Sequence, residues 1–199
     1  MFDEASDSEP LSSILTTLYG LYELKQAEIH FTVGEALSCA GACWQSDVLL
    51  LNLDVTSSYQ GRMKRPSTFE SLLAKLLKDC KTTKPSLKKA SGIWLFSLIQ
   101  NCGHLSEVQA RLRECQAAFM GLLSARDELV QETASRGLSL VYEQGDKTLR
   151  EKLVNDLVAS FTGTSAQLKG MFCCLIWIVC GGLQYPMLCY HVELILCVI

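Results

Sequence analysis

Apolar residues recur every three to four positions over most of the first 161 residues of the chain. This spacing predicts amphipathic helices, each with one face too apolar for water. The links between successive helices of the later part are two to four residues long, which favours antiparallel helix hairpins. The sequence therefore predicts an all-α fold. Helices are predicted over 10–24, 27–43, 68–80, 85–102, 106–123, 127–144 and 147–161.

Some of these helices match one another in sequence. Residues 87–98 superpose on 130–141 at an offset of 43 residues, and 29–39 match the later copy at an offset of 101. An offset of 43 falls within the roughly 40–47-residue period of HEAT and armadillo helix pairs. The copies also share small residues at positions where a neighbouring helix has to come close. We therefore predict an α-solenoid (α-α superhelix) of HEAT-like helical hairpins, in which each hairpin covers the apolar face of the next.

The spacing of the copies also predicts how the chain is divided. The first two copies are 58 residues apart, so about 15 residues are added to the period, and the stretch from Gln45 to Pro66 is the predicted inserted loop. Insertions in repeat proteins lie on one face and often carry contacts. The predicted segments are an acidic disordered N-terminus (1–9), HEAT-like pairs (10–44, 85–124 and 125–169), an insertion with a loop and a basic helix (45–84), and a hydrophobic tail (170–199).

Local signals predict how two of the helices begin and end. Gly103 and Gly145 follow helical runs, at positions where a left-handed residue often ends a helix. Ser106 and Gln109 have the spacing of a capping box, in which each side chain bonds the backbone of the other residue.

Charge is concentrated in one part of the chain, the basic block of residues 62–89, which holds nine basic and two acidic side chains although the whole chain has a net charge of −3. Such a block could bind an acidic partner, or it could be a solvated helix face with a loop, and both interpretations stay open. The overall negative charge argues against a nucleic-acid binder. The candidate partner-binding residues are Arg62, Lys64, Arg65, Lys75, Lys78, Lys81, Lys84, Lys88 and Lys89.

The chain contains no phosphate-binding, dinucleotide-binding, zinc-protease or serine-hydrolase motif. Cys39 with Cys43, and Cys102 with His104, could each offer two metal ligands, but close helix packing explains small apolar cysteines better. We therefore expect no cofactor, no metal site and no catalytic residue of a known motif, although the absence of motifs does not by itself exclude an enzyme. Because the N-terminus does not resemble a secretory signal, the ten cysteines are expected to be reduced thiols in cytosol or nucleus.

The last 30 residues differ from the rest, since 23 of them are apolar. Residues 171–183 would make about 20 Å of helix, which is short of a hydrocarbon core of about 30 Å. Glycines, Pro186 and Glu193 interrupt any longer helix. We favour a poorly packed appendage, with a C-terminal membrane anchor as the alternative, and we expect marginal stability.

Three segments, 29–44, 125–146 and 157–169, resemble parts of a large family of HEAT-repeat proteasome adaptor and scaffold proteins. The resemblance spans about residues 10–169 and implies that the chain corresponds to an interior fragment or a truncated isoform with a divergent tail. It implies a non-catalytic role: binding of proteasome core and regulatory particles in assembly, quality control or tethering to endoplasmic reticulum, endosomes or vesicle and motor-associated proteins. The implied localisation is cytoplasm and nucleus.

Two other functions stay open on the sequence alone. One is a tail-anchored membrane adaptor with a cytosolic helical-repeat body. The other is a HEAT-repeat scaffold unrelated to the proteasome.

Overall fold

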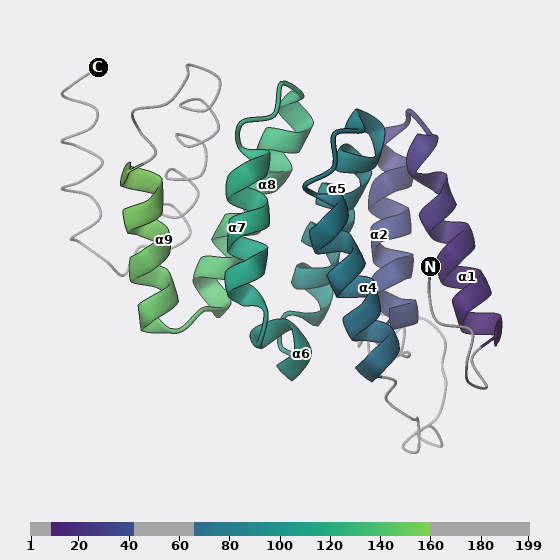
Figure 1. Ribbon diagram of the computed structural model, residues 1–199, viewed down its shortest axis with the longest axis horizontal. Helices are drawn as coiled ribbons and strands as arrows, with labels where there is room; N and C mark the ends of the chain where they lie inside the picture. The colour runs from purple at the N-terminus through teal and green to yellow at the C-terminus, as the bar shows by residue number, and fades with distance from the viewer. Residues whose placement is uncertain (1–8, 42–65, 160–199) are drawn as a thin grey trace. The chain divides into compact units, whose positions relative to one another are not determined.

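The computed structural model describes residues 9–41 and 66–159, and helices are the only regular elements in these two ranges (Figure 1). The prediction of an all-α helical-repeat fold is confirmed. Residues 1–8 of the predicted acidic N-terminus (1–9), residues 45–65 of the predicted inserted loop and the whole predicted hydrophobic tail (170–199) lie outside the described residues. The helices are α1 (Glu9–Gly20), the 3₁₀ turn η1 (Leu21–Glu23), α2 (Ala27–Gly41), α4 (Pro66–Asp79), α5 (Pro85–Cys102), α6 (Ser106–Gln109), α7 (Leu112–Leu122), α8 (Glu128–Gln144) and α9 (Lys147–Ala159).

Within the described ranges, the observed helices agree with the predicted ones to within two residues at each end, except at two places. The end of the predicted helix 10–24 is the 3₁₀ turn η1, and the predicted helix 106–123 is divided into α6 and α7. At the division, the amide of Arg111 bonds the carbonyl of Val108 at 2.9 Å, a tighter turn than in an α-helix. The Arg111 side chain then pairs with Glu114, one turn into α7, at 2.6 Å. Arg111 therefore directly precedes a new helix, α7.

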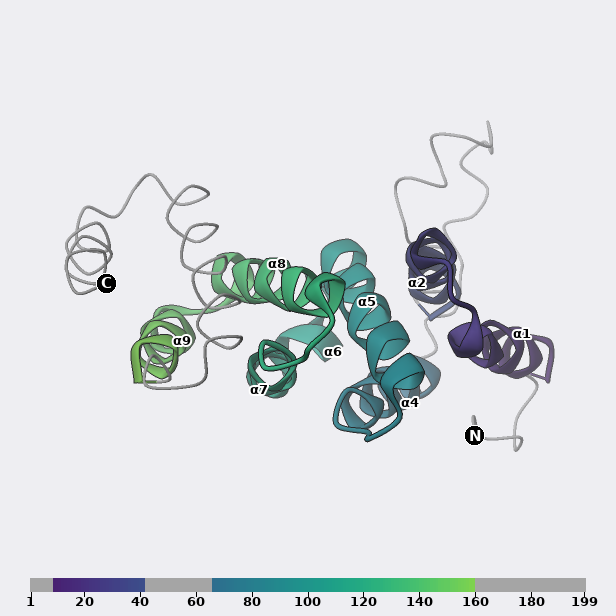
Figure 2. The same cartoon turned by 90° about the horizontal axis from the view of Figure 1, so that it is seen from above.

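The described residues belong to two compact units, 1–118 and 119–199, whose boundary falls within α7. In the first unit, α5 packs along α2 and also against α4, and α1 packs against α2 (Figure 2). A helix covered on several sides is expected to be apolar around most of its circumference. The buried residues of α5 are Ala90, Ser91, Gly92, Ile93, Trp94, Leu95, Ser97, Leu98, Ile99 and Cys102.

The backbones of α2 and α5 come close together at Gly34. A Cβ atom added to Gly34 would lie 2.5 Å from Oγ of Ser97 and 3.4 Å from Cα of Trp94. Only a glycine fits this contact without a shift of one helix. The expectation that small residues mark close helix approach is confirmed here.

The second unit is built on α8 and α9, which pack against each other (Figure 1). Asp127 precedes α8, and its carboxylate accepts hydrogen bonds from the amides of Leu129 at 3.0 Å and Val130 at 3.3 Å. This side-chain cap satisfies amides that have no partner within the helix. The buried apolar residues of the two helices are Val130, Ala134, Leu138, Val141, Leu149, Leu153 and Leu157.

Gly103 and Gly145 directly follow α5 and α8, as predicted, but the left-handed conformation predicted for them and the capping box predicted at Ser106 are wrong. Gly103 has φ −59° and Gly145 has φ −74°, so neither is left-handed. A side chain bonds the turn carbonyl at Gly103 instead, because Nε2 of Gln109 donates to it at 2.6 Å. Leu105, not Ser106, precedes α6, and the Ser106 hydroxyl donates to Glu107.

The assignment of the helices to three repeats with an insertion stays a prediction. The contacts add that α4, the predicted basic helix, packs on α5, α6 and α2. Its buried side is apolar and includes Phe69, Leu72, Leu73, Leu76 and Leu77. The basic helix therefore belongs to the core of the first unit.

Candidate partner-binding site

Six of the nine predicted partner-binding residues lie on the hairpin formed by α4 and α5. Lys75 and Lys78 belong to α4, Lys81 and Lys84 to the turn, and Lys88 and Lys89 to the start of α5. The other three, Arg62, Lys64 and Arg65, lie outside the described residues. The hairpin thus carries six lysines within fifteen residues, 75–89.

The turn that carries Lys81 and Lys84 is short. The amides of Lys81 and Thr82 each bond a carbonyl three residues earlier, at 3.1 Å, so α4 ends in a tight turn. Pro85 then begins α5, a position where its missing amide costs no hydrogen bond. Only five residues, 80–84, therefore separate the end of one helix from the start of the next.

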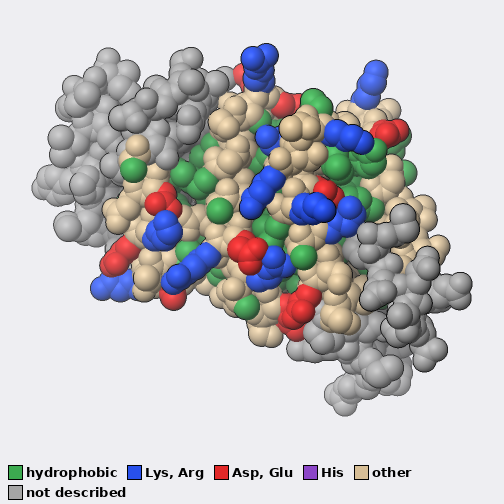
Figure 3. Space-filling model, viewed as in Figure 1, with side chains coloured by type: hydrophobic (Ala, Val, Ile, Leu, Met, Phe, Trp, Pro, Cys, Tyr) green, Lys and Arg blue, Asp and Glu red, His purple; other side chains and the backbone are tan. Residues whose placement is uncertain are grey.

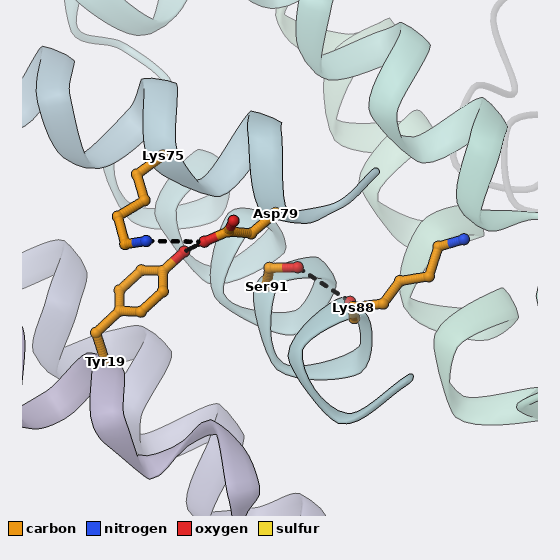
Figure 4. A network of polar contacts seen from close by, with 5 residues as sticks. All are labelled: Tyr19, Lys75, Asp79, Lys88 and Ser91. Carbon is orange, nitrogen blue, oxygen red and sulfur yellow. Dashed lines mark hydrogen bonds and ion pairs between the residues drawn. The ribbon is translucent and has the colours of Figure 1, made fainter. Parts of the chain in front are cut away.

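Lys75 already has partners inside the chain. Its Nζ atom lies 3.1 Å from Oδ2 of Asp79 and 4.4 Å from the centre of the Tyr19 ring. The Tyr19 hydroxyl donates to the same carboxylate oxygen at 2.6 Å, so α1 is joined to α4 (Figure 4). A cation over an aromatic face adds to this ion pair. Lys75 therefore holds two helices together.

The carboxylate of Asp79 is the only acidic group of the segment 75–89, and it is buried at 9% exposure. Burial raises the pKa of the Tyr19 phenol far above its usual value, and the hydrogen bond to Asp79 raises it further. The hydroxyl thus remains a donor at every physiological pH. The Tyr19 ring also lies edge-on to Trp94 of α5, with ring centres 4.9 Å apart.

Lys89 also acts within the chain, through its charge on His30. Burial lowers the pKa of His30, and the positive charge of Lys89 lowers it further, against the effect of a hydrogen bond to the carbonyl of Leu24. His30 in turn lies edge-on to Trp94, with ring centres 6.1 Å apart. The charge of Lys89, on α5, therefore acts on a residue of α2 that packs against α5.

The remaining four lysines, Lys78, Lys81, Lys84 and Lys88, form what we call the lysine turn. Lys88 is half-buried and the other three are exposed. Within the two described ranges none of the four makes an ion pair. Figure 4 shows the Lys88 side chain pointing away from the network of Tyr19, Lys75 and Asp79.

The surface over α4 carries charges of both signs (Figure 3). Glu114 is near enough for Lys81 to contribute to its lowered pKa, but the main cause is the hydrogen bond from Arg111. Glu114 is therefore already paired, and it leaves the lysine turn with an excess of positive charge.

The buried cysteines offer no second site in the part of the chain that the structure describes. Cys80, Cys102 and Cys115 are free and buried, and burial raises the pKa of each thiol to about 12. They are therefore unreactive at neutral pH. No group of three or more metal-ligating side chains is found among the described residues, and Cys43 lies outside them.

Sequence reasoning found the lysines but missed the Tyr19–Asp79 contact. The two residues are 60 positions apart, and neither stands in a motif. The sequence held one signal for this contact: Asp79 is a single acidic residue among six lysines, which could have suggested that one of the lysines is paired with it inside the chain.

None of the helices in the described ranges is both long enough and apolar enough to span a bilayer. This finding does not reach residues 170–199, where the membrane anchor was considered, because they lie outside the described residues.

Comparison with known proteins gives relatives of one kind. Proteasome component ECM29 of Saccharomyces cerevisiae is 42% identical over 145 residues, which cover 71% of this chain and 8% of that protein. Proteasome adapter and scaffold protein ECM29 of Homo sapiens is 34% identical over 149 residues, or 73% of this chain and 8% of that protein. Proteasome component ecm29 of Schizosaccharomyces pombe is 28% identical over 159 residues, which cover 77% of this chain and 10% of that protein. No family model and no solved structure matches the chain.

Proposed function

We propose that this chain, which belongs to the ECM29 family of proteasome-associated proteins, is a scaffold segment that binds proteasome particles. The observation that carries the proposal is 42% identity over 71% of the chain to a relative named as a proteasome component, and 34% over 73% to one named as a proteasome adapter and scaffold. The chain spans a tenth or less of the length of these relatives, so their functions as whole proteins come to it only as a proposal.

The helical structure supports a binding role. Helices packed side by side present extended surfaces, and repeat proteins use such surfaces to bind large partners. We propose that the chain has no catalytic activity of its own and contacts core or regulatory particle subunits in assembly or quality control. Tethering to endoplasmic reticulum, endosomes or vesicle and motor-associated proteins, and residence in cytoplasm and nucleus, belong to the same proposal.

Co-purification tests the proposal directly. The tagged full chain and a version ending at Lys169 are expressed in cells, and proteasome subunits in the eluates are quantified by mass spectrometry. The tag alone and a tagged Leu98→Asp variant, which places a carboxylate in the core of α5, are the controls. We expect core or regulatory subunits to be enriched with both chains over both controls. Equal amounts in all four eluates would overturn the proposal.

A tail-anchored membrane adaptor is the second candidate, because 23 of the last 30 residues are apolar. Alkaline carbonate extraction separates it from the first. Retention of the full chain in the membrane pellet, absence of the version ending at Lys169 from that pellet, and release by detergent would together favour the membrane adaptor. A pellet that detergent does not dissolve would indicate aggregation and count against it. A scaffold unrelated to the proteasome is disfavoured by the family relationship.

A further inference from the structure

We propose that the lysine turn is a docking site for a carboxylate-rich segment of a protein partner. The inference rests on the proposed function only for the identity of the partner, which would be a protein associated with the proteasome. It narrows the predicted basic block to the four lysines Lys78, Lys81, Lys84 and Lys88.

The first argument is the charge left over within the hairpin. Residues 75–89 contain six lysines and one carboxylate. That carboxylate, Asp79, forms an ion pair with Lys75 at 3.1 Å and accepts a hydrogen bond from the Tyr19 hydroxyl at 2.6 Å. It is buried, so it cannot serve as an internal partner for the exposed lysines. Four ammonium groups are thus available to an external anion.

The second argument is the position of Lys88 in the repeat. At offsets of 58 and 43 residues, Lys88 corresponds to His30 and Gln131. Each of these is the fourth residue of its helix and donates to the carbonyl six residues earlier, at 2.8 Å for Leu24 and 2.7 Å for Ala125. Lys88 is also the fourth residue of its helix, α5, but its ammonium makes no such bond among the described residues. The side chain that stabilises the turn in the other two copies is therefore a spare cation here.

The start of α5 adds to the positive field. Positive partial charge gathers at a helix N-terminus. The first turn of α5 contains no acidic residue, and the residue before it is Lys84, whose side chain makes no capping bond. The helix end and the lysines act on the same ligand, although the lysines carry the proposal.

The chemistry favours a protein segment over a nucleic acid. Proteins that bind single strands combine lysines and arginines with aromatic side chains on which bases stack. Residues 75–89 contain no aromatic residue, and the chain as a whole is negative. A flexible run of aspartates and glutamates needs only complementary charge, which lysines with long flexible stems provide.

The experiment measures binding of a fluorescein-labelled octaglutamate peptide to the full chain by fluorescence anisotropy. The test variant is Lys81→Glu/Lys84→Glu/Lys88→Glu. The matched control is Lys25→Glu/Arg113→Glu/Arg126→Glu, which changes the net charge equally at three exposed cations outside the lysine turn. A double variant, Lys81→Glu/Lys84→Glu, leaves the half-buried Lys88 intact. Circular dichroism checks that all variants remain helical.

We expect the triple test variant to weaken binding at least tenfold, the double variant to weaken it several-fold, and the control to change it less than twofold. Binding of the unaltered chain should also weaken between 50 and 300 mM NaCl, because exposed charges are screened. Equal losses in the test and control variants would show a general charge effect and overturn the proposal. Equal or tighter binding of a ten-residue oligothymidylate would also overturn it.

The same variants separate this proposal from the function it rests on. If the peptide binds the lysine turn but no proteasome subunit co-purifies, the docking site stands and the proposed function fails. If proteasome subunits co-purify equally with the unaltered chain and the triple test variant, and the peptide does not bind, the docking site alone fails.

Discussion

At the scale of single residues, the contact between Tyr19 and Asp79 makes the most specific demand on the sequence. Removing the hydroxyl by Tyr19→Phe takes one hydrogen-bond donor from the buried carboxylate of Asp79 and leaves its ion pair with Lys75. Loss of a buried hydrogen bond to a charged group costs about 1–3 kcal/mol. We therefore expect Tyr19→Phe to lower the free energy of unfolding by that amount in urea denaturation.

Tyr22→Phe is the matched control for this prediction. The Tyr22 hydroxyl also donates to a carboxylate, that of Glu23 at 2.9 Å, but this pair is exposed. Water replaces such a bond at little cost, so the unfolding midpoint of Tyr22→Phe should not change. Equal midpoints for the two variants would show that the buried bond does not stabilise α1 against α4.

His30 predicts a dependence of stability on pH. Burial lowers the pKa of His30 in the native state below its ordinary value of 6.5, and Lys89 of α5 lowers it further. As the pH falls through about 6.5, the unfolded chain therefore takes up a proton more readily than the native one, and stability is lost. We expect the unfolding midpoint in urea to be lower at pH 5.5 than at pH 7.5.

The variant His30→Gln isolates this effect from other groups. Gln131, at the corresponding position of the third copy, shows that a glutamine can donate to the turn carbonyl. The variant keeps a donor but has no titratable ring, so its midpoint should fall less between the two pH values. The same fall in both proteins would rule out His30 as the cause.

At the scale of elements, the starts of four helices share one device. The fourth residue of α2, α6, α8 and α9 donates from its side chain to a backbone carbonyl six or eight residues earlier in the chain. The bonded carbonyls are those of Leu24, Gly103 and Ala125, in the turns between helices, and of Tyr142, in the last turn of α8, where carbonyls have no partner within the helix. The four residues are His30, Gln109, Gln131 and Arg150.

This device explains why the helix ranges were predictable while the turns were not. Apolar spacing predicted the full extent of α5, because a period of three to four residues can be recognised from neighbouring positions in the sequence alone. The turns were assigned to left-handed glycines at Gly103 and Gly145, yet side chains several residues further on bond the carbonyls of Gly103 and Tyr142. A donor at the fourth position of a helix is visible in sequence only once the helix start is known.

Gly137 tests how tightly α8 is packed. A Cβ atom at this position would overlap the ring of Phe119. Overpacking a buried contact typically costs about 1–3 kcal/mol, whereas alanine otherwise favours a helix over glycine by about 1 kcal/mol. We expect Gly137→Ala to lower the free energy of unfolding, as measured in urea.

Gly121 of α7 is the matched control, because it is exposed and an added Cβ atom meets nothing within 4 Å. Gly121→Ala should leave the unfolding free energy equal or raise it by up to about 1 kcal/mol. A stabilising Gly137→Ala would mean that Phe119 moves aside easily and that this contact is loose.

At the scale of the whole molecule, the candidate site was only partly predictable. The charge pattern alone indicated the basic block, since nine of the eighteen basic residues lie within residues 62–89. The charge pattern could not show that Lys75 is paired inside the chain while Lys81, among the described residues, is not. That difference depends on the contact of Tyr19 with Asp79, two residues that are 60 positions apart in the sequence. Long-range contacts of this kind decide which charges remain for a partner.

The packing of the described helices leads to a prediction about overall stability. In helical-repeat proteins each element is stabilised mainly by its neighbours, so stability is a sum of local terms. In α1, Ile14 is 52% exposed, and Leu24, which follows η1, is 39% exposed, so part of the apolar surface there stays in water. We expect the midpoint of thermal unfolding of the full chain to lie below about 70 °C when unfolding is monitored by circular dichroism at 222 nm. One cooperative transition above that temperature would contradict a stability built from local terms. Replacing Ile14 by Lys should leave the midpoint unchanged, whereas Leu15→Ala, at a fully buried position beside it, should lower it by several degrees.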